Sequence, residues 1–178
     1  MIHESYHWKR DLLRDADIIE RWAAKKTESE YRSMLLEKKV FLSAFVIRKL
    51  IEDYKVTDKS AECSILCRVY PARGTEVNIM NWHDIDEHYD LSSEQRADIN
   101  IKSFANQIIH NLVFMFESSK ERSSPISGFV VASDWGKGKQ LYGVTLSAYL
   151  SAMRSVGKDW VMERHAERTK DGWKISQQ

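Results

Sequence analysis

The sequence VFLSAFVI, at residues 40–47, is apolar on nearly every face that a helix would present. A surface helix carries a polar face, so this pattern is typical of a central helix that neighbouring elements cover. We predict that the helix runs over 28–55, because Thr27 and Glu30 have the Thr-x-x-Glu spacing of a capping box. A covered helix needs other elements packed around it, so this stretch decides the fold class.

The same helix carries an arginine directly after its apolar stretch. Arg48 shares a stripe with Glu37 and Glu52 at helical spacing. A buried charge needs a partner. We therefore expect Arg48 to pair with one of the two carboxylates if it is shielded from water.

Scarce chain breakers indicate that the first part of the chain is helical. The 178 residues include 7 glycines and 2 prolines, against about twelve and nine at average usage. Every glycine lies at or after Gly74. Apolar residues at spacings of three and four predict a helix over 6–26 and a third long helix from 92 or 93 to 116.

The rest of the chain is rich in strand and turn signals. Alternating or β-branched runs around turn residues indicate β-hairpins. The predicted hairpins pair 63–70 with 75–80, 126–133 with 139–146, and 160–168 with 173–176, the last around Asp171 and Gly172. We also expect a short helix or structured loop over 81–91 and a helix over 147–156.

These elements predict an α+β fold in which a bundle of long helices carries appended β-hairpins. We expect one domain over 1–178, with a helical part over 1–117 and a part over 125–178 packed on it. The second part has only about fifty-five residues, which form a thin core alone. The polar connection 118–125 is the best internal boundary, but it is too short for a flexible tether.

Composition predicts a soluble, cytoplasmic protein. No apolar run approaches the ~20 residues that span a bilayer, and the first residues lack the plan of a secretory signal. Cys63 and Cys67 are too few for a four-cysteine zinc site, so we expect small buried residues in a reducing compartment. Residues 120–178 carry 10 Lys and Arg against 6 Asp and Glu, which permits contact with an acidic partner.

Asn106 and His110 are the best candidates for a chemical site. They are four residues apart on the predicted third helix and therefore project from one face. Histidine can take or give a proton near neutral pH, and Arg48 on the neighbouring helix can supply the positive charge that a phosphoryl transition state needs. The alternative is a structural histidine bonded to Asn106 or to a helix carbonyl.

An Asn-x-x-x-His pair late in a long helix resembles the HEPN superfamily (higher eukaryotes and prokaryotes nucleotide-binding), whose fold is a helical bundle. The signature of that superfamily is an arginine, a polar residue, about three further residues and a histidine. In this chain Ala105 stands at the arginine position, followed by Asn106 and His110. The segments KVFLSAFVIRKLIEDYKVTD (39–58) and NQIIHNLVF (106–114) also look like a family of bacterial proteins with no assigned activity. The resemblance covers residues 6–117.

The resemblance implies RNA cleavage by a homodimer, with no metal ion or cofactor. His110 would assist attack by the ribose 2′-hydroxyl, and Asn106 would orient that hydroxyl or contact the phosphate. Because Ala105 replaces the signature arginine, three outcomes stay open: Arg48 substitutes for it in space, the chain cleaves poorly, or it binds RNA or a protein without catalysis. The second hypothesis is accordingly a non-catalytic interaction or dimerisation module, such as an antitoxin-like or phage-defence accessory subunit.

For two further groups of residues, the sequence predicts neither a metal site nor a phosphate-binding loop. Imidazoles and carboxylates crowd residues 83–90, but their spacing matches no metal-binding motif, and a solvated loop explains them equally well. The run WGKGK at residues 135–139 lacks the spacing of a phosphate-binding loop. We interpret it as a hairpin tip, whose two lysines can still touch a nucleic-acid backbone.

Overall fold

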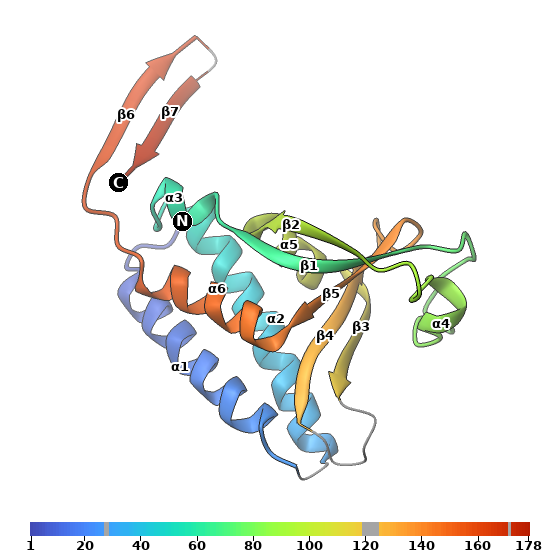
Figure 1. The fold of residues 1–178 in the computed structure, drawn as a ribbon. Coiled ribbons are helices and arrows are strands. Elements are labelled where there is room, and N and C mark those ends of the chain that lie inside the picture. The colour runs from blue at the N-terminus through green and yellow to red at the C-terminus, as the bar shows by residue number, and fades with distance from the viewer. Residues whose placement is uncertain (27–28, 119–124, 171) are drawn as a thin grey trace.

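The computed structural model describes residues 1–26, 29–118, 125–170 and 172–178. Figure 1 shows the elements, which follow one another as α1 (Tyr6–Ala23), α2 (Glu30–Glu52), α3 (Asp58–Ala61), β1 (Ser64–Pro71), α4 (Ile85–His88), β2 (Gln95–Asn100), α5 (Ile101–Ile109), β3 (Asn111–Ser118), β4 (Ile126–Ser133), β5 (Gln140–Thr145), α6 (Leu146–Lys158), β6 (Arg164–Thr169) and β7 (Gly172–Gln177). Thr27 of the predicted capping box, most of the predicted connection 118–125 and Asp171 of the predicted turn lie outside the described residues.

The centre of the fold is a five-stranded antiparallel sheet in the order β2-β1-β5-β4-β3. The larger core cluster joins one face of this sheet to α1, α2, α5 and α6. A smaller cluster lies on the other face, beneath the chain between β1 and β2, which includes α4. Strand β4 is covered on both faces, because Phe129 and Val131 belong to the larger cluster and Val130 and Ala132 to the smaller one.

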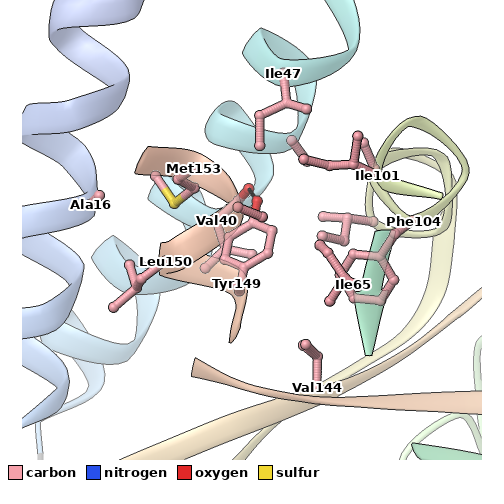
Figure 2. Close-up of a cluster of buried hydrophobic side chains, with 14 of the residues drawn as sticks. Ala16, Val40, Ile47, Ile65, Ile101, Phe104, Val144, Tyr149, Leu150 and Met153 are labelled. Carbon is pink, nitrogen blue, oxygen red and sulfur yellow. Dashed lines mark hydrogen bonds between the residues drawn. The ribbon is translucent and has the colours of Figure 1, made fainter. Parts of the chain in front are cut away.

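Tyr149 of α6 occupies the middle of the larger cluster, among side chains from α1, α2 and α5 (Figure 2). It is 1% exposed, and its ring packs edge-on against Phe129 at 5.2 Å between centroids. Its hydroxyl donates to the carbonyl of Val40 at 3.1 Å and lies 2.8 Å from Oγ of Ser43. The one polar atom that this aromatic side chain brings into the core is therefore paired.

The prediction of a helical bundle with appended hairpins is wrong, because the sheet forms the centre of the molecule. β1 from the first part of the chain pairs with β5 from the second. The strands after residue 125 are therefore part of the central sheet and are not appended to a helical bundle. The hairpin predicted from 126–133 and 139–146 is confirmed as β4 and β5, yet both strands lie inside the sheet. The helix predicted over 147–156 and the last predicted hairpin are confirmed as α6 and as β6 with β7.

The third long helix predicted over 92–116 is also wrong, since this segment is a strand, a short helix and a strand. The side chain of Asn100 accepts hydrogen bonds from the backbone N–H groups of Lys102 and Ser103, which starts α5. After Ile109 the apolar residues alternate between faces of the sheet, with Phe114 on the helix side and Val113 on the other. One apolar run therefore satisfies a period of 3.6 and then a period of 2.

The first predicted hairpin fails because β1 takes different neighbours. β1 pairs with β2 and β5, and residues 75–80 form no strand. The predicted hairpin paired β1 with the next apolar run in the sequence, whereas the strands that pair with β1 in the sheet are about thirty residues and more away.

Within the described residues, the helices are too short or too polar to cross a membrane.

Candidate functional site

The junction between α5 and β3 positions His110. This residue ends the helix, and its backbone N–H donates to the carbonyl of Asn106 at 3.1 Å. Its own carbonyl accepts from the N–H of Asp134, at 2.8 Å, in the turn after β4. The backbone is thus fixed on both sides while the imidazole stays exposed to solvent.

Arg48 approaches this imidazole from α2. The distance from Nη1 of Arg48 to Nε2 of His110 is 3.2 Å, and the Arg48 side chain is 31% exposed. A guanidinium has donors only, so Nε2 of His110 accepts this hydrogen bond. In this contact the lone pair of Nε2 faces a permanent cation.

Glu52, one turn after Arg48, completes a charged cluster. Its Oε1 accepts from Nε of Arg48 at 2.9 Å and lies 3.6 Å from Nζ of Lys102, the second residue of α5. The hydrogen bond from Arg48, with the nearby charge of Lys102, lowers the pKa of the Glu52 carboxyl. We call Arg48, Glu52, Lys102 and His110 the α2–α5 cluster. It holds two cations and one anion, which leaves a net positive charge.

Asn106 lies one turn before His110 and is half-buried. Its side-chain oxygen Oδ1 is buried and has no hydrogen-bond partner among the described residues. Ala105, at the position of the signature arginine, is 2% exposed and packs in the core. An arginine at position 105 would place its charge in the core, whereas Arg48 contacts the His110 imidazole from the neighbouring helix.

The structure brings Arg48 and His110 together, and it pairs Arg48 with Glu52 rather than Glu37. Sequence reasoning missed Lys102, although its spacing of four from Asn106 and eight from His110 was a signal for the same helix face. It also missed a depression of about 270 Å³ beside the cluster, lined by Glu52, Lys102, Tyr54 and Gln177 among others.

Within the imidazole and carboxylate cluster of residues 83–90, His88 has a structural role. His88 is 3% exposed, and its ring nitrogens lie 2.7 Å from Oγ1 of Thr75 and 3.0 Å from the carbonyl of Asn81. Both ring nitrogens of His88 are therefore occupied in holding the chain between β1 and β2. Across the described ranges no group of three or more His, Cys, Asp or Glu side chains is placed to hold a metal ion.

The glycine-lysine run after β4 is a turn that carries one very exposed aromatic residue. Trp135 is 87% exposed, and Nζ of Lys137 lies 2.6 Å from Oδ1 of Asp134.

The two cysteines differ in burial, because Cys67 is buried and Cys63 is half-buried. Burial raises the pKa of the Cys67 thiol to about 12, so this thiol is inert at neutral pH.

Comparison of the chain with protein-family models, with curated proteins and with solved structures finds no match. The helical bundle that the resemblance to the HEPN superfamily implies is not the fold observed. The activity that it implies stays a prediction, and function has to be argued from the α2–α5 cluster itself.

Proposed function

We propose that this protein binds RNA and cleaves it without a metal ion, through Arg48 and His110. The observation that carries the proposal is the contact between the Arg48 guanidinium and Nε2 of His110 at an exposed junction. A fixed cation stabilises the charge that develops on a phosphoryl group, and a neutral imidazole can accept a proton from the nucleophile. The pair supplies both at one point of the surface.

In the proposed reaction, a phosphodiester replaces the imidazole as the partner of Arg48, whose guanidinium binds the non-bridging oxygens. Nε2 of His110, then free, takes the proton of the adjacent ribose 2′-hydroxyl. The 2′-oxygen forms a bond to phosphorus, the bond from phosphorus to the 5′-oxygen breaks, and water protonates the departing 5′-oxygen. The hydroxide left by this water takes the proton from His110 and returns the imidazole to its starting form. The products are a 2′,3′-cyclic phosphate and a 5′-hydroxyl end.

Asn106 and Lys102 support this proposal. A buried acceptor without a partner costs folding free energy unless a ligand satisfies it, and Oδ1 of Asn106 is such an acceptor. We propose that the Asn106 side chain turns toward solvent when RNA binds, because Oδ1 is buried in the free protein, and that it then accepts from a ribose hydroxyl of the bound strand. Lys102 lies on the other side of Glu52, where its ammonium can contact a neighbouring phosphate.

The test is incubation of the purified protein with end-labelled single-stranded RNA in EDTA. We expect fragments that end in 2′,3′-cyclic phosphate, and we expect His110→Ala to slow their formation by about 10²–10⁴-fold. His83→Ala is the matched control, because His83 is an exposed histidine, 55% accessible, outside the cluster. RNA that stays intact at high protein concentration, with and without added metal ions, would refute cleavage.

The outer face of α2 favours a second candidate function, the dimerisation module. Tyr31, Met34, Leu42 and Phe45 share one side of this helix, opposite the buried residues, and are 66%, 49%, 49% and 48% exposed. Large apolar side chains gathered on an exposed face are typical of an interaction site. We propose that this outer face of α2 pairs with a second copy of the chain, as an isologous interface between two identical helices.

Light scattering tests this candidate by measuring the molar mass at micromolar concentration. We expect a dimer for the natural chain and a monomer for Phe45→Glu. Leu66→Glu serves as the control, since Leu66 is 53% exposed on β1, away from α2. A natural chain that is monomeric at this concentration rejects the interface, whatever the result with RNA.

A further inference from the structure

The last two strands form a hairpin that stands away from the rest of the fold (Figure 1). We call residues 164–177 the C-terminal arm. All six residues of β6 are exposed. A two-stranded hairpin that no other element covers is marginally stable in water. The contacts that hold this arm in place therefore have to be identified.

The arm is attached at its root to the C-terminal end of α2. Nη2 of Arg164 and Nε2 of Gln177 both donate to the carbonyl of Tyr54, at 2.6 Å and 3.0 Å. The backbone N–H of Gln177 donates to Oδ2 of Asp58 at 3.0 Å. Tyr54 has φ of 57°, a left-handed conformation that side chains other than glycine rarely adopt. This conformation ends α2, so the arm is fastened to a rigid helix terminus.

The register of the hairpin gives the arm two unlike faces. Opposed residues of an antiparallel pair lie on the same face, so Arg164, Ala166 and Arg168 share a face with Gln177, Ile175 and Trp173. Arg168 lies directly opposite Trp173, which is 66% exposed. Among the described residues of the arm, this basic face carries no acidic side chain, whereas Glu167 belongs to the other face.

The basic face leads toward the α2–α5 cluster. At the root it ends at Gln177, which lines the same depression of about 270 Å³ as Glu52 and Lys102. Glu52 accepts the hydrogen bond of Arg48, which in turn contacts His110. The buried root of the arm and the cluster therefore border the same depression, whose lining also includes the carboxylate of Asp58.

We infer that the basic face of the C-terminal arm binds a single-stranded stretch of RNA, with a phosphate on Arg168 and a base stacked on Trp173. Arginine charge and an exposed aromatic ring are the features that single strands require, because every nucleotide offers a phosphate and a stacking surface. This inference rests on the proposed RNA-directed function. It adds the part of the surface that holds the strand beyond the scissile phosphate.

Fluorescence anisotropy with a labelled single-stranded RNA of about sixteen nucleotides tests the inference on the full chain. We expect Trp173→Ala to weaken binding about tenfold, as for the loss of one stacked base. Arg168→Ala should weaken binding and also reduce the slope of log Kd against log salt concentration by about 0.7, the share of one phosphate contact. Arg168→Lys keeps the charge and should restore the slope.

The control is Arg96→Ala, which removes an arginine that is 74% exposed on β2, outside the arm. It should leave the Kd and the salt slope unchanged. Circular dichroism verifies that each variant is folded, and light scattering verifies its molar mass.

The outcomes separate this inference from the proposed cleavage. Arm variants that bind RNA as tightly as the natural chain overturn the inference, even if RNA is cleaved. RNA that is bound through the arm but never cleaved overturns the proposed catalysis and leaves the inference standing. A change of molar mass in Trp173→Ala, with RNA affinity unchanged, assigns the arm to protein contact and overturns the inference. A natural chain that does not bind RNA overturns both.

Discussion

Two polar networks join α2 to another helix, and they differ in burial and in pairing. The network of Ser43 and Tyr149 lies in the core, where the Tyr149 hydroxyl is paired with Oγ of Ser43 and with the carbonyl of Val40. The network of Arg48 and His110 is open to solvent, and the nearby Oδ1 of Asn106 has no partner among the described residues. Paired and buried groups specify one packing, whereas accessible charges beside an unpaired acceptor suit a ligand.

The difference has a physical cause in the sequence of α2. Ser43 and Arg48 lie on different sides of the helix, because five residues rotate the side-chain direction by one full turn and about 140° more. The side of Ser43 meets α6 through Tyr149, and the side of Arg48 meets the exposed end of α5 at His110. Changes in the first network should therefore alter stability, and changes in the second should alter chemistry.

The largest effect is expected when the core network loses its aromatic ring. Tyr149→Ala leaves a cavity among buried neighbours, and loss of a buried aromatic side chain costs about 3–5 kcal/mol. Urea denaturation measures the free energy of unfolding. Trp135→Ala is the control, because Trp135 is 87% exposed and its loss should change the free energy by at most about 0.5 kcal/mol. Equal midpoints for the two variants would contradict the assignment of Tyr149 to the core.

A smaller effect, of a different kind, is expected at Arg48. Arg48→Lys retains one positive charge but loses the planar fork that binds two phosphate oxygens. We expect the rate of RNA cleavage to fall about a hundredfold, as for removal of one donor that stabilises a transition state. The free energy of unfolding should change by less than about 1 kcal/mol, because the Arg48 ion pair is partly exposed. A rate loss that merely follows a loss of stability would assign Arg48 to the scaffold.

The sequence predicted those elements whose signals are local. Apolar spacing was enough for α1, α2 and α6, and turn residues were enough for the hairpin of β4 and β5. The pairing of β1 with β2 and β5 is non-local, so no short-range signal distinguished it from pairing with 75–80. The prediction of one helix over 92–116 was wrong because it did not recognise Asn100 as an N-cap or His110 as the end of α5.

The candidate site was partly predictable for the same reason. Asn106 and His110 were found from their spacing, and Arg48 from its position after an apolar run. The distance of 3.2 Å between Arg48 and His110 depends on how α2 and α5 pack, which a pattern of residue types does not contain. The C-terminal arm was predicted as a hairpin, but its attachment to Tyr54 depends on a helix terminus more than a hundred residues away in sequence.

The smallest effect is a pH dependence of stability that only the exposed network should show. Arg48 and Lys102 lower the pKa of Glu52 below its ordinary value of 4.5. A carboxyl with a lowered folded-state pKa contributes stability above its unfolded pKa and loses that contribution as pH falls through the folded pKa. The exposure of the pair limits the contribution to at most about 1 kcal/mol.

Urea denaturation of the natural chain and of Glu52→Gln at several pH values measures this contribution. We expect the difference between the two proteins to be constant near pH 7 and to shrink as the pH falls below the ordinary carboxyl pKa of 4.5 and through the lowered folded-state pKa. Tyr149→Phe is the comparison from the core network, and its difference from the natural chain should stay level over the same range, since a phenol does not titrate there. A Glu52 difference that persists at low pH would mean that this side chain stabilises the fold through packing, and the ion pair with Arg48 would then have no share in holding α2 against α5.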